Sequence, residues 1–111
     1  MESVIDSTTL PGSGMSRQFE GENHDVGISL FLVNAAPEGG PRLHLHPYEE
    51  VFIVHEGRGT FTLDQAQVDA GPGDIVVAPA ETPHRFVNSG TERLRLTAIH
   101  HSPRYVTEWL E

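Results

Sequence analysis

The stretch PRLHLHPYEEVFIVHEGRG, residues 41–59, is the most informative part of this chain. It places two histidines two positions apart, then two adjacent glutamates, then an apolar run that ends at a glycine turn. Alternate residues of a β-strand share one side of the sheet. One face then carries Arg42, His44, His46, Tyr48 and Glu50, and continues into Phe52 and Val54. The other face carries Leu43, Leu45 and Glu49. Provided that Pro47 leaves the alternation intact, Glu50 joins the histidines and Glu49 points away.

Two imidazoles and a carboxylate buried together carry a desolvation cost, which coordination of a divalent cation offsets. A third histidine, His84, follows the proline-bounded turn in PAETPHRFVN. The pair of histidines alone is equally typical of surface or packing residues. The in-phase Glu50 and the distant His84 favour a metal site with three nitrogen ligands and one oxygen ligand.

The rest of the chain breaks into short β-branched and aromatic runs between glycine, proline and aspartate turns. This pattern predicts an all-β sandwich or barrel. Residues 1–16 are rich in Ser, Thr, Gly and Pro and predict an N-terminal arm, which leaves 17–111 as a single domain. The tail RYVTEWLE is compatible with either a helical turn or a final strand.

These motifs resemble those of the cupins. The first cupin motif has a His-x-His pair, three or four further residues, a glutamate and a later glycine, as His44, His46, Glu50 and Gly57 have here. The second is matched by Gly73, Pro79, His84 and Asn88. Two glycines depart from the pattern: Glu38 occupies the opening position with Gly39 one place nearer, and Glu81 replaces a glycine of the second motif.

The resemblance implies a small double-stranded β-helix, or jelly-roll, barrel. It also implies one divalent transition metal (Fe, Mn, Ni, Co, Cu or Zn) held by His44, His46, Glu50 and His84 at one end of a cavity. Four protein ligands would leave a coordination position open for water, dioxygen or substrate. The candidate cavity residues are Arg42, Tyr48, Phe52, Phe86, Leu96 and His100.

Two of these candidates have competing interpretations. Arg42 could bind a substrate carboxylate, but a salt bridge at the rim is the favoured alternative. His100 shares a face with Leu94 and Leu96 and is expected on the barrel wall rather than as a fifth ligand. Trp109, near the end of the chain, predicts a packing or interface anchor.

The amino-acid composition excludes some classes of binding partner. The chain has 111 residues, and seven Lys and Arg against sixteen Asp and Glu give a formal net charge of −9, which argues against nucleic acid and anionic membranes. The absence of cysteine excludes disulfides and thiolate sites. Because the sequence shows neither a signal-peptide pattern nor a long apolar stretch, we expect a cytoplasmic protein.

Three functions remain open from the sequence. The first is a metal-dependent enzyme acting on a small organic, possibly anionic, molecule; similar small cupins include dioxygenases, isomerases and decarboxylases. The second is a non-catalytic domain that binds or senses a small molecule, and the third is a barrel whose metal is structural. We also expect a homodimer, because a small barrel leaves apolar faces such as that of Leu43 and Leu45 uncovered and the arm could cross to a second subunit.

Overall fold

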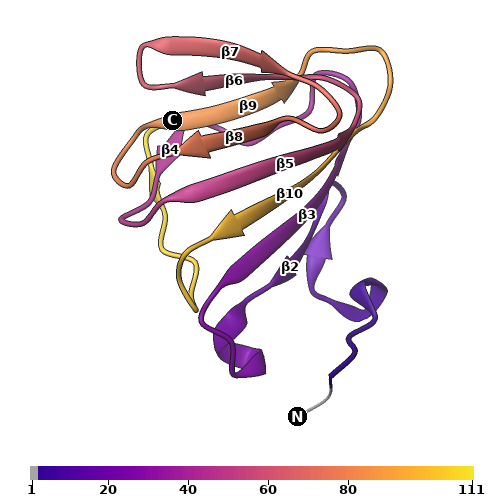
Figure 1. Ribbon diagram of the computed structural model, residues 1–111, viewed down its shortest axis with the longest axis vertical. Helices are drawn as coiled ribbons and strands as arrows, with labels where there is room; N and C mark the ends of the chain where they lie inside the picture. Colours follow the sequence, from indigo (N-terminus) through magenta and orange to yellow (C-terminus); the bar gives the residue numbers. More distant parts are fainter. Residues whose placement is uncertain (1–2) are drawn as a thin grey trace.

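The computed structural model describes residues 3–111, and these residues form two antiparallel β-sheets packed face to face (Figure 1). One sheet has the strand order β1 (Gly12–Ser13), β2 (Ser16–Phe19), β3 (Ser29–Ala35), β10 (Leu94–His100), β5 (Glu50–Glu56) and β8 (Ile75–Ala78). The other has the order β11 (Glu108–Trp109), β4 (His44–Leu45), β9 (His84–Asn88), β6 (Gly59–Leu63) and β7 (Ala66–Ala70). The predicted all-β jelly-roll is confirmed.

Helical structure is confined, within residues 3–111, to two short 3-10 helices, η1 (Ser7–Thr9) and η2 (Gly21–His24). The predicted arm contains η1, and its residues from Gly12 onward already join the six-stranded sheet through β1. Residues 1 and 2 of that arm lie outside the described part of the chain. Of the two alternatives for the tail, the strand is correct: β11 pairs with β4. None of the helices in residues 3–111 has the length and apolar character needed to cross a membrane.

The space between the sheets is apolar at one end and polar at the other. Along β5 the inward side chains are Glu50, Phe52 and Val54, and β10 runs antiparallel to it with His100 opposite Glu50. The phenylalanine rings of β5, β6 and β9 pack together with centroids 5.2 to 5.9 Å apart. This aromatic core fixes the strands whose ends supply the polar residues.

Backbone geometry explains which motif glycines matter. Gly57, which closes the first motif, has a φ of +81°, and a Cβ there would lie 2.3 Å from the carbonyl oxygen of Arg93. Glu81, which replaces a glycine of the second motif, adopts the left-handed conformation with a φ of 65°. Its backbone N–H donates to the carbonyl oxygen of His46 over 2.8 Å. The substitution therefore keeps the turn of the motif, at the cost of a conformation that favours glycine.

Candidate metal centre

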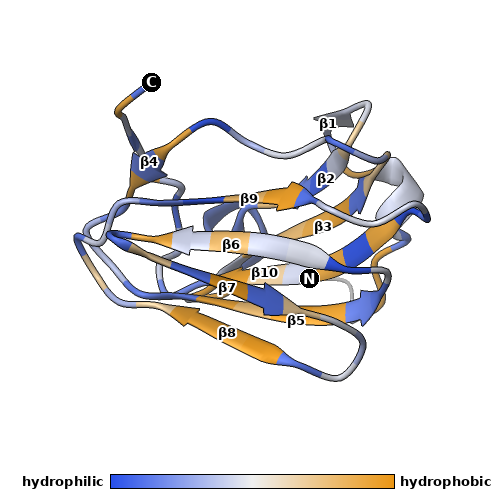
Figure 2. Cartoon of the chain, turned by 90° about the horizontal axis from the view of Figure 1, so that it is seen from above, coloured by the Kyte–Doolittle hydropathy of each residue, from blue (hydrophilic) through white to orange (hydrophobic). Residues whose placement is uncertain are grey.

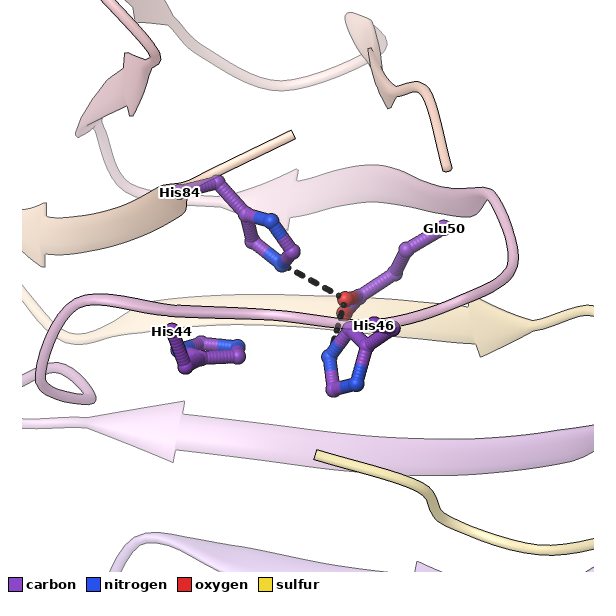
Figure 3. Close-up of side chains that lie close together, drawn as sticks. All are labelled: His44, His46, Glu50 and His84. Carbon is purple, nitrogen blue, oxygen red and sulfur yellow. Dashed lines mark hydrogen bonds and ion pairs between the residues drawn. The ribbon is translucent and has the colours of Figure 1, made fainter. Parts of the chain in front are cut away.

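Three strands bring together the four residues that the sequence selects. His44 lies in β4, paired with His84 at the start of β9, while Glu50 begins β5 and His46 follows β4. One ligand atom from each of the four lies within 4.8 Å of the others. Figure 3 shows the rings and the carboxylate directed into one common space. All four are at least 93% buried. Pro47 does not break the alternation, since Glu50 points inward and Glu49 is exposed and paired with His101.

Each of the three imidazoles is oriented by a backbone carbonyl. The Nδ1 atom of His44 lies 2.7 Å from the carbonyl oxygen of Arg42, and the Nδ1 atom of His84 lies 2.8 Å from that of Thr82. The Nδ1 atom of His46 lies 2.8 Å from the carbonyl oxygen of Val106. A carbonyl only accepts hydrogen bonds, so Nδ1 must carry the proton in each ring. In the neutral imidazole, Nε2 is then a free lone pair, which is how metal-binding histidines are usually oriented.

These lone pairs face a carboxylate. The Nε2 atoms of His84 and His46 lie 2.9 Å and 3.1 Å from Oε1 of Glu50. The His46 contact is not aligned as a hydrogen bond, and within residues 3–111 this buried Nε2 has no hydrogen-bond partner. A lone pair facing a carboxylate oxygen is repulsive unless a positive charge lies between them. A proton on the Nε2 atom of His84 would make only the contact between His84 and Glu50 favourable. A divalent cation would interact favourably with all four residues, so the donor set fits a metal ion.

Burial and charge shift the pKa values here in different directions. Burial lowers the pKa of His44 to about 4, against the opposing effect of the Arg42 carbonyl. Burial also acts to raise the pKa of Glu50, but the imidazoles of His100, His46 and His84 outweigh it and hold that pKa well below its ordinary value. For His84 burial is opposed by the Glu50 carboxylate, and the pKa is raised. Glu50 is therefore ionised and His44 neutral at pH 7, as metal ligands must be.

His100 lies inward too, but its hydrogen bonding differs from that of the other three histidines. Its Nδ1 lies 2.7 Å from the hydroxyl oxygen of Tyr48, and that oxygen accepts from the backbone N–H of Val106 over 3.3 Å. The Tyr48 hydroxyl is thus free to donate to Nδ1, which places the ring proton of neutral His100 on Nε2. That Nε2 lies 3.2 Å from Oε2 of Glu50. As for His46, this contact is not aligned as a hydrogen bond, and within residues 3–111 the buried Nε2 of His100 has no hydrogen-bond partner. His100 differs from the other three histidines in that its Nδ1 partner is a hydroxyl and not a backbone carbonyl.

The C-terminal tail builds part of this centre, which the sequence reasoning did not foresee. Val106 supplies the carbonyl for His46 and the N–H for Tyr48. Trp109 pairs with His44 across β11 and β4, with ring centroids 5.1 Å apart. The sequence predicted a packing or interface role for Trp109 and did not place this segment near the site. The contacts of Val106 are made by its backbone, so the residue type at this position could not predict them.

A cavity of about 270 Å³ adjoins the cluster. Its apolar wall includes Phe31, Phe52 and Phe86, and its polar wall includes Glu50 and His100. Within residues 3–111 its lining includes no Lys or Arg. The lining residues are Met15, Ser16, Gln18, Phe31, Val33, Pro41, His44, His46, Glu50, Phe52, Phe86, Ala98, His100, Thr107 and Trp109.

Three of the candidate cavity residues lie elsewhere. Arg42 is exposed, and its guanidinium carbon lies 5.1 Å from the ring centroid of Trp109. Leu96 is 2% exposed and belongs to the aromatic core beyond the cavity. Tyr48 does not line the cavity; its ring stacks on that of His46, with centroids 5.0 Å apart, and its hydroxyl contacts His100. The cavity wall instead includes Phe31, which alternation along β3 could have indicated.

Comparisons with known proteins agree with this geometry. A family model described as "Cupin domain" matches residues 31–100. An uncharacterized protein of Methanocaldococcus jannaschii is 31% identical over 80 residues, which cover 69% of this chain and 64% of that protein. This chain therefore spans somewhat less than two thirds of the curated relative.

Solved structures of the same fold include enzymes of oxalate. An oxalate decarboxylase of Bacillus subtilis, studied for its Mn(II) centres, superposes with a TM-score of 0.81 at 23% identity, over 93% of this chain and 30% of that chain. The Lactobacillus farciminis oxalate decarboxylase in a formate complex gives 0.77 at 22%, over 90% and 32% of the two chains. An oxalate oxidase in complex with glycolate gives 0.77 at 18%, over 96% and 63%. At these identities the likeness is one of fold.

Proposed function

Because this chain belongs to the cupin domain family, we propose that it binds one divalent transition metal through His44, His46, Glu50 and His84 and acts on a small organic anion. The observation that carries the proposal is the shared orientation of the three histidines. In each ring Nδ1 lies at hydrogen-bond distance from a backbone carbonyl, which leaves Nε2 as the nitrogen available to a cation within the cluster. This arrangement is costly unless a cation occupies the centre.

Manganese is the first ion to test. Three imidazoles and a carboxylate suit several first-row ions, and availability often decides among them. The Bacillus subtilis oxalate decarboxylase that shares the fold is described by its Mn(II) centres. That likeness supports Mn(II) ahead of Fe, Co, Ni, Cu and Zn for this chain.

The charge of the site favours a substrate with a single negative charge. A divalent ion and the Glu50 carboxylate together leave one net positive charge, because His44 is neutral and the other imidazoles would bind as neutral ligands. The cavity lining within residues 3–111 offers no Lys or Arg to balance a second anionic group. The phenylalanines of the wall suit a short apolar or aromatic portion. We therefore favour a small monoanionic chelator over the dianion oxalate.

The residues of this chain would hold and orient such a substrate. Phe31, Phe52 and Phe86 exclude water from the inner wall of the cavity. The Nε2 atom of His100 lies 3.2 Å from Oε2 of Glu50, close enough for His100 to help position the carboxylate. When bound, the ion would supply Lewis-acid polarisation of a substrate oxygen. The reaction class within the decarboxylase, isomerase and dioxygenase group is left to experiment.

A substrate screen with metal-loaded protein tests this proposal. Small 2-oxo acids, hydroxy acids and enolisable diketones would be incubated with the protein while an oxygen electrode and mass spectrometry follow consumption and products. Oxalate serves as the dianionic comparison. We expect turnover of a monoanion, lost in Glu50→Gln. Ligands that bind tightly and are recovered unchanged would support the sensing function instead, and neither binding nor turnover across the set would contradict both.

A further inference from the structure

Residues 106–111 cross one end of the two sheets, and we call this segment the strap. In Figure 1 the yellow tail that contains it runs from the end of β10, in one sheet, to β4, in the other. Thr107 and Trp109 of the strap line the cavity beside the cluster. All four candidate ligands are at least 93% buried. The strap therefore forms part of the wall between the buried cluster and solvent.

The strap also orients one of the candidate ligands. The Nδ1 atom of His46 lies 2.8 Å from the carbonyl oxygen of Val106, the first residue of the strap. The corresponding carbonyls of His44 and His84 belong to residues only two positions earlier in the chain. Those two contacts depend on the local course of the backbone, whereas the contact of His46 joins residues 60 positions apart. The orientation of His46 thus depends on the strap being in place.

The residue before the strap, Tyr105, is held firmly by the six-stranded sheet. Its backbone N–H donates to Oε2 of Glu20 over 3.1 Å. Its hydroxyl donates to the carbonyl oxygen of Phe19 over 3.0 Å and also contacts that of Leu30. Its ring packs against Phe31, with centroids 4.5 Å apart. These contacts fix the point from which the strap starts.

The far end of the strap is held more weakly. Its strand, β11, is two residues long, whereas β5 and β10 each have seven residues. The Leu110 N–H donates to the Leu43 carbonyl over 3.0 Å, but Leu110 and Trp109 are 42% and 53% exposed. Figure 2 shows the end of the chain projecting beyond β4, away from the two sheets. Exposed segments with few buried contacts open locally at a small cost in free energy.

We propose that the strap is a hinged cover of the cavity that turns about Tyr105 and orients His46 when it closes, a role that rests on the proposed function of this site. In the closed position the strap gives His46 its carbonyl partner and places Trp109 beside His44, with ring centroids 5.1 Å apart. In the open position His46 loses that partner, and its Nε2 is no longer directed into the cluster. Access to the cavity and the loosening of one candidate metal ligand are then a single movement.

A disulfide that holds the strap closed tests the proposal. Leu45 and Glu108 face each other across β4 and β11. Facing residues of antiparallel strands have Cα atoms about 4.5–5.5 Å apart, within the ~4.4–6.8 Å that a disulfide spans. Because the chain has no cysteine, Leu45→Cys combined with Glu108→Cys forms one defined bond. The matched control is Thr62→Cys combined with Gln67→Cys, a facing pair of β6 and β7 that does not line the cavity.

The readout is the rate at which a chelator removes Mn(II) or Zn(II) from the loaded protein. Oxidation of the Leu45–Glu108 variant should slow this removal about tenfold or more, because release would have to await local opening of the strap. Reduction should restore the rate, and the control disulfide should leave it unchanged. Equal rates from the oxidised and reduced strap variant would overturn the proposal, and so would an equal slowing by the control disulfide.

Nuclear magnetic resonance of the metal-free protein separates the role of the strap from the proposed function. In the natural sequence the ring nitrogen signals of His46 should place its proton on Nδ1. In a chain that ends at Tyr105, His46 should populate both tautomers. His84, whose carbonyl partner Thr82 lies outside the strap, should keep Nδ1 protonated and so report that the barrel is folded.

The two experiments fail in different ways. An unchanged His46 in the shortened chain would overturn the role of the strap even if the natural sequence binds metal normally. A natural sequence that takes up no metal, but whose His46 responds to loss of the strap, would reject the proposed function and retain the strap as the element that orients His46.

Discussion

The Nε2 atom of His100 lies 3.2 Å from Oε2 of Glu50, whereas His46 and His84 approach Oε1 of the same carboxylate. The two oxygens of Glu50 thus face two kinds of histidine. In the two near Oε1, Nδ1 lies against a backbone carbonyl, whereas the Nδ1 partner of His100 is the Tyr48 hydroxyl. We infer that Oε1 is the oxygen available to a metal, and we expect the neighbouring His100 to position the carboxylate.

His100→Ala should weaken metal binding by about 10- to 100-fold, the usual effect of losing a residue that orients a ligand. His100→Gln should restore part of the affinity, since its amide N–H can donate to Glu50. Competition with a coloured chelator measures both. His101→Ala is the matched control, because His101 is the next residue but is exposed and contacts Glu49. An unchanged affinity in His100→Ala would reject the positioning role.

Glu50→Gln should reduce metal affinity far more than Glu49→Gln. The first substitution removes a buried anionic candidate ligand, while the second removes an exposed carboxylate that pairs with His101. Isothermal titration with Mn(II) or Zn(II) compares the two variants with the natural sequence. Equal losses of metal affinity in both variants would contradict the assignment of Glu50, rather than Glu49, as the carboxylate ligand.

The stability of the metal-free protein should depend on pH through His44. Its pKa is about 4 in the folded protein against an ordinary value of 6.5, so the unfolded chain binds the proton more tightly. This contribution to stability is therefore complete above pH 6.5 and is lost as the pH falls toward 4. The pKa of His84 is raised in the folded protein, so protonation of His84 stabilises the fold and opposes the effect of His44.

Comparison with His44→Asn isolates this contribution. Urea unfolding of metal-free protein at several pH values between 7 and 4 gives the free energy of unfolding of each protein. The stability of the natural sequence should fall more steeply than that of the variant over this window. Parallel curves would show that His44 is not held neutral by burial.

Glu81→Gly should stabilise the protein by about 0.5–1 kcal/mol. The left-handed conformation costs a non-glycine residue ~1–2 kcal/mol, and the greater freedom of glycine in the unfolded chain offsets part of the gain. Gly57→Ala should be destabilising, because its φ is +81° and its Cβ would meet the Arg93 carbonyl. Thermal unfolding of the three proteins checks both directions, and a Glu81→Gly protein of lower stability would contradict the strain argument.

Local patterns were sufficient to predict the fold class and the four clustered residues. The spacing of His44, His46 and Glu50 correctly predicted that they lie together, and the proline-bounded turn correctly predicted that His84 begins a strand. Glu50 lies on the side that alternation predicts even though β4 ends at Leu45 and the chain bends at Pro47 and Tyr48.

The features that depend on strand neighbours could not be predicted in this way. Arg42 has the right phase for the cavity, yet its side chain stacks on Trp109, which the tail brings to β4. The contact between Tyr48 and His100 joins residues 52 positions apart. Backbone groups such as the Val106 carbonyl orient His46 irrespective of their residue type.

Metal content measured by mass spectrometry after equilibrium dialysis tests the central claim most directly. The natural sequence, dialysed in turn against Mn, Fe, Co, Ni, Cu and Zn, should retain one ion per chain with at least one of these metals. His84→Ala and Glu50→Gln should lose that ion, while His101→Ala should retain it. A chain that takes up none of the six metals, or that binds them equally well without His84 and Glu50, would contradict the assignment of this cluster as a metal centre.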